Sequence, residues 1–336
     1  MTNRAAVLVD LRTVVLEDRP EPEMGPRDVV VAVRSVGVCG SDVHYYREGR
    51  IGDFVVEAPL ILGHEAAGVV VAAGELVTRL GVGQRVTIEP GVPDGTCVQC
   101  QAGRYNLCPE VRFLATPPVD GAFIERISVP EAFAHPVPDL LSDDAAALIE
   151  PLSVAVAACR VAAVGLGSSV LVTGAGPIGV LVAQVASCAG ARRVLITDPD
   201  PDRRQRATRL TGAEVWSPDE LPAKLAVDAF IECSGSSSAV TAGLHALAPA
   251  SRAVLVGMGA ASVELPVGLI QRKELIVTGT FRYANTYPLA IALAASGRID
   301  LDLLVDRAFG LAEVGAALDA GTSDRSVMKA IVRVQT

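Results

Sequence analysis

Three residue types that bind zinc occur in two short stretches near the N-terminus. Cys39 begins the stretch Cys-Gly-Ser-Asp-Val-His, and His64 and Glu65 stand side by side between Gly63 and Gly68. A thiolate, an imidazole nitrogen and a carboxylate oxygen bind Zn²⁺ and leave a fourth position open, as a catalytic zinc requires. A lone Cys or His is more often an ordinary buried or surface residue. The prediction of a metal site therefore depends on the motifs further along the chain.

A second group of candidate ligands follows within one short segment. Asp94, Cys97, Cys100 and Cys108 have the spacing x2, x2 and x7. Two close thiolates are typical of a tetrahedral structural zinc, and a carboxylate also ligates zinc, though it is a harder ligand. The alternative is a metal-free lobe in which these cysteines are simply buried. The first interpretation predicts two zinc ions per chain.

Glu150 is a carboxylate among apolar residues. It lies within a predicted helix, residues 142–160, and Glu150-Pro151 is expected to break that helix. A carboxylate is rarely buried without a partner. Glu150 is therefore either a helix cap or solvated side chain, or a member of the metal site.

The second half of the chain carries a dinucleotide-binding motif. Gly174 to Gly179 reads Gly-Ala-Gly-Pro-Ile-Gly, after the apolar strand Ser169–Thr173 and before an apolar helix to about Ala189. The next strand, Val194–Thr197, ends at Asp198. In this context the glycines allow a tight turn and close approach of a pyrophosphate to the helix N-terminus.

The acidic residues after the second strand favour NAD⁺ over NADP⁺. Asp198 is expected to bind the adenosine ribose, and Asp200 and Asp202 would repel a 2′-phosphate. Arg203 and Arg204 argue in the other direction, since they either contact the adenosine end or are solvated on a helix.

The secondary structure expected to position these residues differs between the two parts of the chain. Residues 1–148 are rich in Val, Gly and Pro and predict an all-β lobe, with strands at 28–38 and 68–74 and a turn leading into another strand within 80–88. Strands and helices then alternate, with further strands at 229–232, 253–257 and 275–279 and helices at 236–247 and 286–296. About six parallel strands are expected, and ligands bind at the carboxyl ends of such strands.

Composition excludes several classes of protein. The 336 residues carry a net charge of −9 without a basic cluster, so a nucleic acid is not an expected partner. Residues 161–191 are uncharged, but Gly and Pro divide them into a strand, a turn and a helix rather than a membrane span. Seven cysteines without an N-terminal apolar run argue against disulfides and favour the cytoplasm.

Taken together, these motifs resemble those of the zinc-dependent medium-chain dehydrogenases, in the polyol branch that includes sorbitol and xylitol dehydrogenases. The resemblance extends along the whole chain. It is carried by residues 38–45, 49–56, 62–65, 103–107, 115–118, 148–153, 174–179 and 280–286.

The resemblance implies an α/β fold of two domains. A GroES-like β-barrel catalytic domain would comprise residues 1–150 and 284–336, and a doubly wound Rossmann domain residues 151–283. Cys39, His64 and Glu65 would hold the catalytic zinc, and Glu150 would lie beside the zinc-bound water or ligate zinc in an alternative coordination. Ser41 and His44 would conduct the proton. The family's structural zinc uses four cysteines, and here Asp94 replaces the first.

The resemblance also assigns residues to the cofactor and the substrate. The expected cofactor-binding residues are Gly174, Gly176, Pro177, Ile178, Gly179, Asp198, Arg203, Ser234, Val256, Gly257, Met258, Thr280, Phe281 and Arg282. The expected substrate-binding residues are Tyr45, Phe54, Phe113, Thr116, Arg282 and Tyr283.

The expected activity is zinc-dependent, NAD-linked oxidation of a polyol to a ketose by a homotetramer or homodimer, with no nucleic-acid or membrane partner. A sugar acid, a tetritol or a vicinal diol are alternative substrates. A zinc-free quinone or enone reductase, or a dinucleotide-binding protein without activity, is disfavoured because Cys39, His64 and Glu65 are all present.

Overall fold

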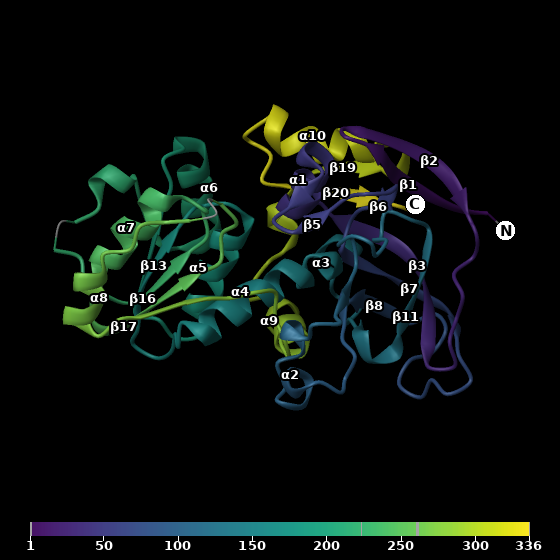
Figure 1. Ribbon diagram of the computed structural model, residues 1–336, viewed down its shortest axis with the longest axis horizontal. Coiled ribbons are helices and arrows are strands. Elements are labelled where there is room, and N and C mark those ends of the chain that lie inside the picture. Colours follow the sequence, from purple (N-terminus) through teal and green to yellow (C-terminus); the bar gives the residue numbers. More distant parts are fainter. Residues whose placement is uncertain (1, 223, 260–261, 336) are drawn as a thin grey trace. The chain divides into compact units, whose positions relative to one another are not determined.

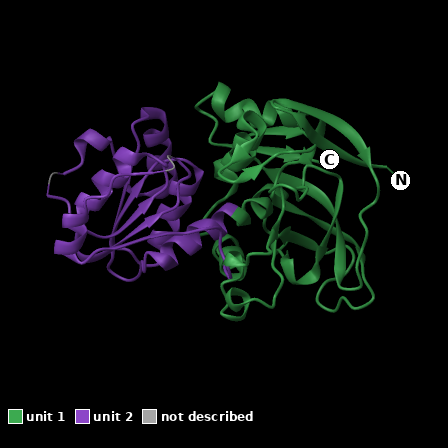
Figure 2. Cartoon of the chain, in the orientation of Figure 1, with its two compact units in different colours: residues 1–150, 287–336 green, residues 151–286 purple. Residues whose placement is uncertain are grey.

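A computed structural model describes residues 2–222, 224–259 and 262–335. The chain forms two compact units (Figure 2), one of residues 1–150 and 287–336 and one of residues 151–286. Each is described by itself below. None of the helices in these ranges has the length and apolar character that crossing a membrane requires.

The first unit is built on two β-sheets (Figure 1). The larger has the order β12-β8-β7-β3-β20-β19, and β11 also pairs with β3. The smaller has the order β2-β1-β6, and an isolated bridge pairs Ala5 of β1 with Ile124, two residues before β11. The strands of these sheets are β1 (Asn3–Asp10), β2 (Thr13–Arg19), β3 (Asp28–Gly37), β6 (Leu60–Ile61), β7 (Glu65–Ala73), β8 (Arg85–Ile88), β11 (Arg126–Pro130), β12 (Ala134–Pro136), β19 (Val305–Gly310) and β20 (Lys329–Arg333).

Shorter elements complete this unit. Two small antiparallel pairs join β4 with β5 and β9 with β10. These elements are β4 (Arg50–Ile51), β5 (Phe54–Val55), β9 (Gly91–Val92), β10 (Arg112–Phe113), and the helices α1 (Gly40–Glu48), α2 (Val98–Gln101), α3 (Asp143–Ala147), α9 (Tyr287–Ala295) and α10 (Val314–Ser323).

The central pair β3–β7 brings two sequence motifs together. Valines of β3 are buried, as its Val-rich sequence predicts. The register places Gly37 opposite Glu65. A Cβ on Gly37 would lie 1.9 Å from Glu65 Oε2, so only glycine leaves room for this carboxylate. The strand therefore ends two residues before Cys39 and directly beside Glu65.

The second unit is a parallel sheet of six strands with the order β15-β14-β13-β16-β17-β18, flanked by helices (Figure 1). This is the doubly wound sheet that the alternating pattern predicted, and the strand order reverses beside β13. Its strands are β13 (Ser169–Thr173), β14 (Arg193–Thr197), β15 (Glu214–Trp216), β16 (Val227–Glu232), β17 (Leu247–Leu255) and β18 (Ile276–Gly279). Its helices are α4 (Ile149–Val161), which begins in the first unit, α5 (Pro177–Cys188), α6 (Pro201–Thr211), α7 (Ser237–Ala246) and α8 (Val267–Lys273).

One predicted helix break is in the wrong place. The expected interruption at Glu150-Pro151 lies instead at Leu148, between α3 and α4. Pro151 stands in the first turn of α4, where a backbone N–H has no intrahelical acceptor and its loss costs little. Glu150 thus belongs to the first turn of the second helix.

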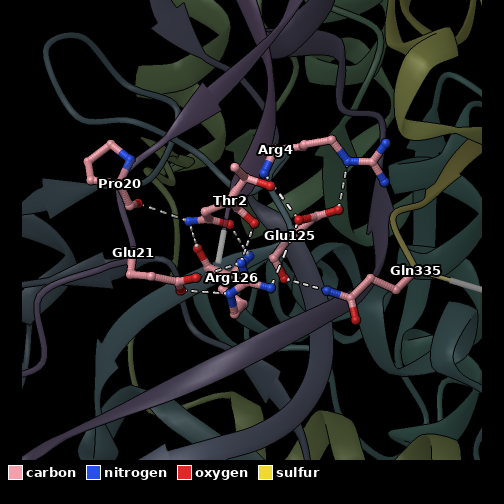
Figure 3. A network of polar contacts seen from close by, with 8 residues as sticks. Thr2, Arg4, Pro20, Glu21, Glu125, Arg126 and Gln335 are labelled. Atoms are coloured by element: carbon pink, nitrogen blue, oxygen red, sulfur yellow. Dashed lines mark hydrogen bonds and ion pairs between the residues drawn. The ribbon is translucent and has the colours of Figure 1, made fainter.

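Both chain ends are fastened by a polar network on the first unit (Figure 3). The Arg126 guanidinium donates to Thr2 O (2.7 Å) and to both carboxylate oxygens of Glu21 (2.8 and 2.9 Å). The side chain of Gln335 donates to Glu125 O (2.9 Å), and Arg4 pairs with the Glu125 carboxylate (3.0 Å). Residues near both termini therefore contact the same strand, β11, and the residue before it.

Candidate functional site

Cys39, His64 and Glu65 come together in the first unit. Each offers one ligand atom, and the three atoms lie within 4.8 Å of one another. Cys39 is the N-cap of α1, and Glu65 is the first residue of β7. His64 and Glu65 are 6% and 1% exposed, and Cys39 is partly exposed.

Asp42 ties the two ligand segments to each other. It is fully buried, and its carboxylate accepts the Cys39 N–H (3.0 Å) and the Gly63 N–H (2.9 Å). Its Oδ1 also lies 3.5 Å from His64 Nδ1. Burial raises the pKa of Asp42, but His64 and the two backbone donors together lower it by more. The pKa of Asp42 therefore lies below its usual value. Sequence reasoning included Asp42 in a motif but gave it no role.

Lys329 is the second residue that sequence reasoning missed. Its ammonium donates to Glu65 Oε1 (2.6 Å) and to Val38 O (2.8 Å), and its side chain is 4% exposed. Burial lowers the pKa of Lys329, but the carboxylate of Glu65, with Cys39 and Glu150, raises it above its usual value. An isolated lysine 264 positions from its partner carries no local sequence signal.

The residues of this group fit a zinc ion. Glu65 Oε2 is buried and has no hydrogen-bond partner, so the carboxylate keeps one oxygen available for a cation. Burial lowers the pKa of His64, but Asp42 and Cys39 raise it well above its ordinary value. The surroundings of the imidazole therefore favour positive charge, and the donor set of S, N and O is one that zinc accepts.

The other residues expected near this group differ in their placement. Phe113 is 8% exposed and its ring centroid lies 5.6 Å from that of His64. Glu150 is 4% exposed and lies outside the three-residue group, although its charge acts on Lys329. Ser41 is half-buried on α1, and His44 Nδ1 lies 3.3 Å from Glu48 Oε1.

The expected substrate-binding residues are spread over both units. In the first unit, Tyr45 is buried and borders a small cavity of about 180 Å³ with residues 8–11 and 56–59. Phe54 is 43% exposed on β5, and Thr116 is half-buried. In the second unit, Tyr283 is buried and the Arg282 guanidinium lies 4.7 Å from the Phe281 ring centroid. Their role in binding a substrate remains a prediction.

Asp94, Cys97, Cys100 and Cys108 form a second group of ligand atoms within 4.8 Å of one another. Asp94 Oδ1 accepts the N–H groups of Thr96 (2.7 Å) and Cys97 (3.1 Å), which lower the pKa of Asp94. The carboxylate is therefore held in place by its own loop, although it is exposed to solvent. Three thiols and one carboxylate at this spacing fit a structural zinc.

The carboxyl ends of the parallel strands in the second unit surround a cavity of about 730 Å³. Five of the expected cofactor-binding residues line it: Gly174, Gly176, Asp198, Arg203 and Ser234. Pro177, Ile178, Gly179, Val256, Gly257, Met258, Thr280, Phe281 and Arg282 are not part of that lining and remain predictions. Residues from 217–221 and 236–243 also line the cavity, and the sequence did not predict them as part of the cofactor site.

Local geometry explains how the glycine motif is shaped. Gly174 has φ +90°, which favours glycine. A Cβ on Gly179 would lie 1.8 Å from Gly174 O, so the helix packs closely on the loop. Asp198 is buried and accepts the Ala175 N–H on Oδ2 (2.8 Å) and the Asp200 N–H on Oδ1 (2.8 Å). Asp198 thus holds the loop in shape as well as lining the cavity.

Segments of both units match families of known proteins. Residues 25–139 match the family described as "Alcohol dehydrogenase GroES-like domain", and residues 177–296 match "Zinc-binding dehydrogenase". Sorbitol dehydrogenase from Mus musculus is 43% identical over 316 residues, which is 90% of this chain and 88% of that protein. The chain belongs to the zinc-dependent medium-chain dehydrogenases, in their polyol branch.

Further relatives support this assignment to the family. The probable D-xylulose reductase A of Neosartorya fischeri is 41% identical, covering 90% of this chain and 89% of that protein. The crystal structure of L-idonate 5-dehydrogenase from Escherichia coli superposes with a TM-score of 0.94 over 99% of each chain, at 28% identity. The expected family and fold, a GroES-like domain with a doubly wound sheet, are therefore confirmed. As a family member, the protein is an oxidoreductase that uses zinc and a nicotinamide dinucleotide.

Proposed function

We propose that this protein oxidises a secondary hydroxyl group of a polyol to a ketone, giving a ketose, with NAD⁺ as the hydride acceptor. The observation that carries the proposal is the group of Cys39, His64 and Glu65, whose ligand atoms lie within 4.8 Å of one another. The similarity to sorbitol dehydrogenase over most of the chain supports a polyol as substrate.

The proposed chemistry assigns a task to each residue near this group. Cys39, His64 and Glu65 would hold zinc, which supplies the positive charge that lowers the pKa of a substrate hydroxyl. Ser41 would accept the substrate proton and His44 would pass it to solvent, because His44 is partly exposed on the same helix. The Phe113 ring beside His64 would exclude water from the reacting carbon.

Polar residues would distinguish a polyol from a simple alcohol. Glu150, Tyr45, Arg282 and Tyr283 each offer hydrogen-bonding groups for further hydroxyls. A site that hydrogen-bonds several hydroxyl groups discriminates strongly against alcohols that lack them, because its own polar groups would then be left unpaired.

The proposal includes NAD⁺ rather than NADP⁺. Asp198 lines the dinucleotide cavity and its carboxylate is buried, so a 2′-phosphate next to it would meet negative charge. Asp200 and Asp202 follow directly on the N-terminal turn of α6. Arg203 also lines the cavity, and we assign it to the adenosine end of the dinucleotide.

The second ligand group would hold a structural zinc through Asp94, Cys97, Cys100 and Cys108. Its ligands come from one short loop and show no bond between sulfur atoms: the Sγ atoms of Cys97 and Cys100 are 3.5 Å apart. All seven cysteines are free thiols, which is typical of the reducing cytoplasm where we place the enzyme.

We also propose that the enzyme is a homotetramer or homodimer. The strand β18 stands at the end of the parallel sheet, and Ile276 on it is 45% exposed. An uncovered sheet edge with an exposed apolar residue is suited to pairing across a two-fold axis. Light scattering of the purified protein measures the number of chains directly.

A panel of alcohols tests the proposed activity. NADH formation is measured with sorbitol, xylitol, a tetritol, a vicinal diol and a sugar acid, with NAD⁺ or NADP⁺, before and after treatment with a zinc chelator. Chelator-sensitive, NAD⁺-linked oxidation of a polyol is expected. Reaction with only the sugar acid would favour the second candidate, which the similarity to L-idonate 5-dehydrogenase supports. Zinc-loaded protein that oxidises none of them would contradict the proposal.

A further inference from the structure

The buried carboxylate of Glu232 lies at the point where three strands of the parallel sheet end. Glu232 is the last residue of β16 and is 1% exposed. The register places it beside Thr173 of β13 on one side and Leu255 of β17 on the other. The loops that follow β13 and β16 line the dinucleotide cavity. A charge at this position needs strong partners, because burial of an unpaired carboxylate is costly.

The partners of Glu232 belong to the loop that follows it. Its Oε1 accepts the Ser234 N–H (2.6 Å), the Ser234 hydroxyl (2.5 Å) and the Gly235 N–H (2.9 Å). The Thr173 hydroxyl, at the start of the glycine motif, also donates to Oε1 (3.4 Å). The carboxylate therefore connects the loop after β16 to the end of β13.

Glycine packing extends the connection to the loop after β17. A Cβ on Gly257 would lie 2.7 Å from Glu232 Oε2 and 2.3 Å from Gly235 N. A Cβ on Gly259 would lie 1.9 Å from Gly235 O, and one on Gly174 would lie 3.0 Å from Ser234 N. The backbones of three loops are thus in close contact around one carboxylate.

Glu232 itself does not line the cavity, whereas Thr173, Gly174 and Ser234 do. Its carboxylate draws the Ser234 and Gly235 N–H groups inward, so the ligand meets a wall whose shape Glu232 sets. A group that shapes the wall without reaching the ligand changes the affinity for the dinucleotide rather than the chemical step.

We infer that Glu232 is a positioning residue for the dinucleotide: it fixes the loops after β13, β16 and β17 in the conformation that binds NAD⁺. The inference rests on the proposed NAD-linked function. A positioning role differs from a merely structural one in its consequence: a variant that lacks the Glu232 carboxylate should still fold but should bind the dinucleotide more weakly.

The test compares Glu232→Gln with a matched control. Glutamine has the same size but carries no charge, and its NH₂ group would replace either Oε1 or Oε2, both of which accept the Gly235 N–H (2.9 and 3.1 Å). The control is Glu131→Gln in the first unit, since Glu131 is also buried and its Oε2 accepts two loop N–H groups, from Thr78 and Arg79 (both 3.0 Å). Measurements are the Kd for NADH by fluorescence, KM for NAD⁺ and for the alcohol, kcat, zinc content and melting temperature.

For Glu232→Gln, the Kd for NADH and the KM for NAD⁺ are expected to rise about 10-fold or more, the scale of lost hydrogen bonds to a charged group. The kcat at saturating NAD⁺ and the KM for the alcohol should change by less than about 2-fold, because these bonds do not reach the reacting atoms. Glu131→Gln should lower the melting temperature and leave the Kd for NADH unchanged.

Ser234→Ala provides a second, milder variant in case Glu232→Gln does not fold. It removes one of the donors to Glu232 and should raise the Kd for NADH about 3-fold, with no further rise when combined with Glu232→Gln. The inference is overturned if both variants bind NADH as tightly as the wild type, or if the Glu131 variant loses affinity equally. A wild-type protein that binds no NADH would instead refute the proposed function.

Discussion

The two groups of candidate zinc ligands differ in how their side chains are held. Cys39, His64 and Glu65 come from two segments, and His64 and Glu65 are buried, whereas the ligands in residues 94–108 come from one loop with Asp94 exposed. Two charged residues outside the ligand set hold the first group: Asp42, which joins the two ligand segments, and Lys329 from the distant strand β20. The second group is held by hydrogen bonds within its own loop.

This difference separates a reactive site from a structural one. Zinc in the first group would depend on charged partners outside the ligand set that fix the ligands and balance their charge, and such partners affect both metal affinity and reactivity. Zinc in the loop would mainly stabilise the loop itself. Variants that remove one partner from each group should therefore produce different kinds of loss.

The largest expected effect follows from Lys329→Met. Glu65 would lose its buried counter-charge and the bond that orients it, so we expect kcat/KM to fall about 10- to 100-fold, together with weaker zinc retention. Steady-state kinetics and zinc analysis after dialysis measure both losses. The melting temperature should fall too, because a buried carboxylate is left unpaired.

Lys273→Met is the matched control for this variant. The Lys273 ammonium donates to two main-chain carbonyl groups, those of His245 and Leu247, rather than to a carboxylate. Its replacement should leave kcat/KM and zinc content unchanged. Wild-type kinetics and zinc content in Lys329→Met would show that Lys329 does not orient Glu65 for zinc.

A smaller effect, of a different kind, is expected from Asp94→Ala. It should reduce zinc from two ions per chain to one and lower the melting temperature by several degrees, while kcat of the remaining folded enzyme stays within about 2-fold. Asp94→Cys should restore the second ion, because thiolate is the softer ligand. A wild-type protein with one zinc per chain would contradict the assignment of the loop, and a large loss of kcat in Asp94→Ala would contradict the contrast between the two groups.

The sequence predicted what depends on local spacing. Cys39, the His64-Glu65 pair and the Cys-x2-Cys loop were found because ligand types recur at short intervals, and the glycine motif was found because a strand and a helix flank it. The doubly wound parallel sheet was predicted from the same alternation of strands and helices. These features can be predicted without knowing which residues far apart in the sequence contact one another.

The sequence did not predict what depends on tertiary contacts. Lys329 meets Glu65 only because β20 pairs with β3 and so brings the C-terminal strand to the site. Glu232 was placed on a strand, but its role depends on three strand ends meeting. The short strand β15 and the cavity wall at residues 217–221 also lacked a signal, because three residues give too little periodicity.

The smallest expected effect concerns an exposed pair and extends the contrast between buried and exposed charges. The hydrogen bond from Arg126 lowers the pKa of Glu21 below its ordinary value of 4.5, and this carboxylate is exposed to solvent (Figure 3). Because the pKa is lower in the folded state, the pair stabilises the protein above pH 4.5 and the contribution disappears as the pH falls through the folded-state pKa. Solvent and salt screen such a pair, so the contribution is small.

Glu21→Gln should therefore lower the melting temperature by about 1 °C at pH 7 and low salt, and by less at pH 4 or at 1 M salt. Differential scanning calorimetry at the two pH values measures the change, with Glu17→Gln as the control, since Glu17 is also exposed and makes one contact to Arg19 (3.0 Å). An equal loss at both pH values would mean that packing of the Glu21 side chain, rather than its charge, stabilises the network. The buried Glu65–Lys329 pair should behave in the opposite way, since added salt reaches it little and its loss persists at 1 M salt.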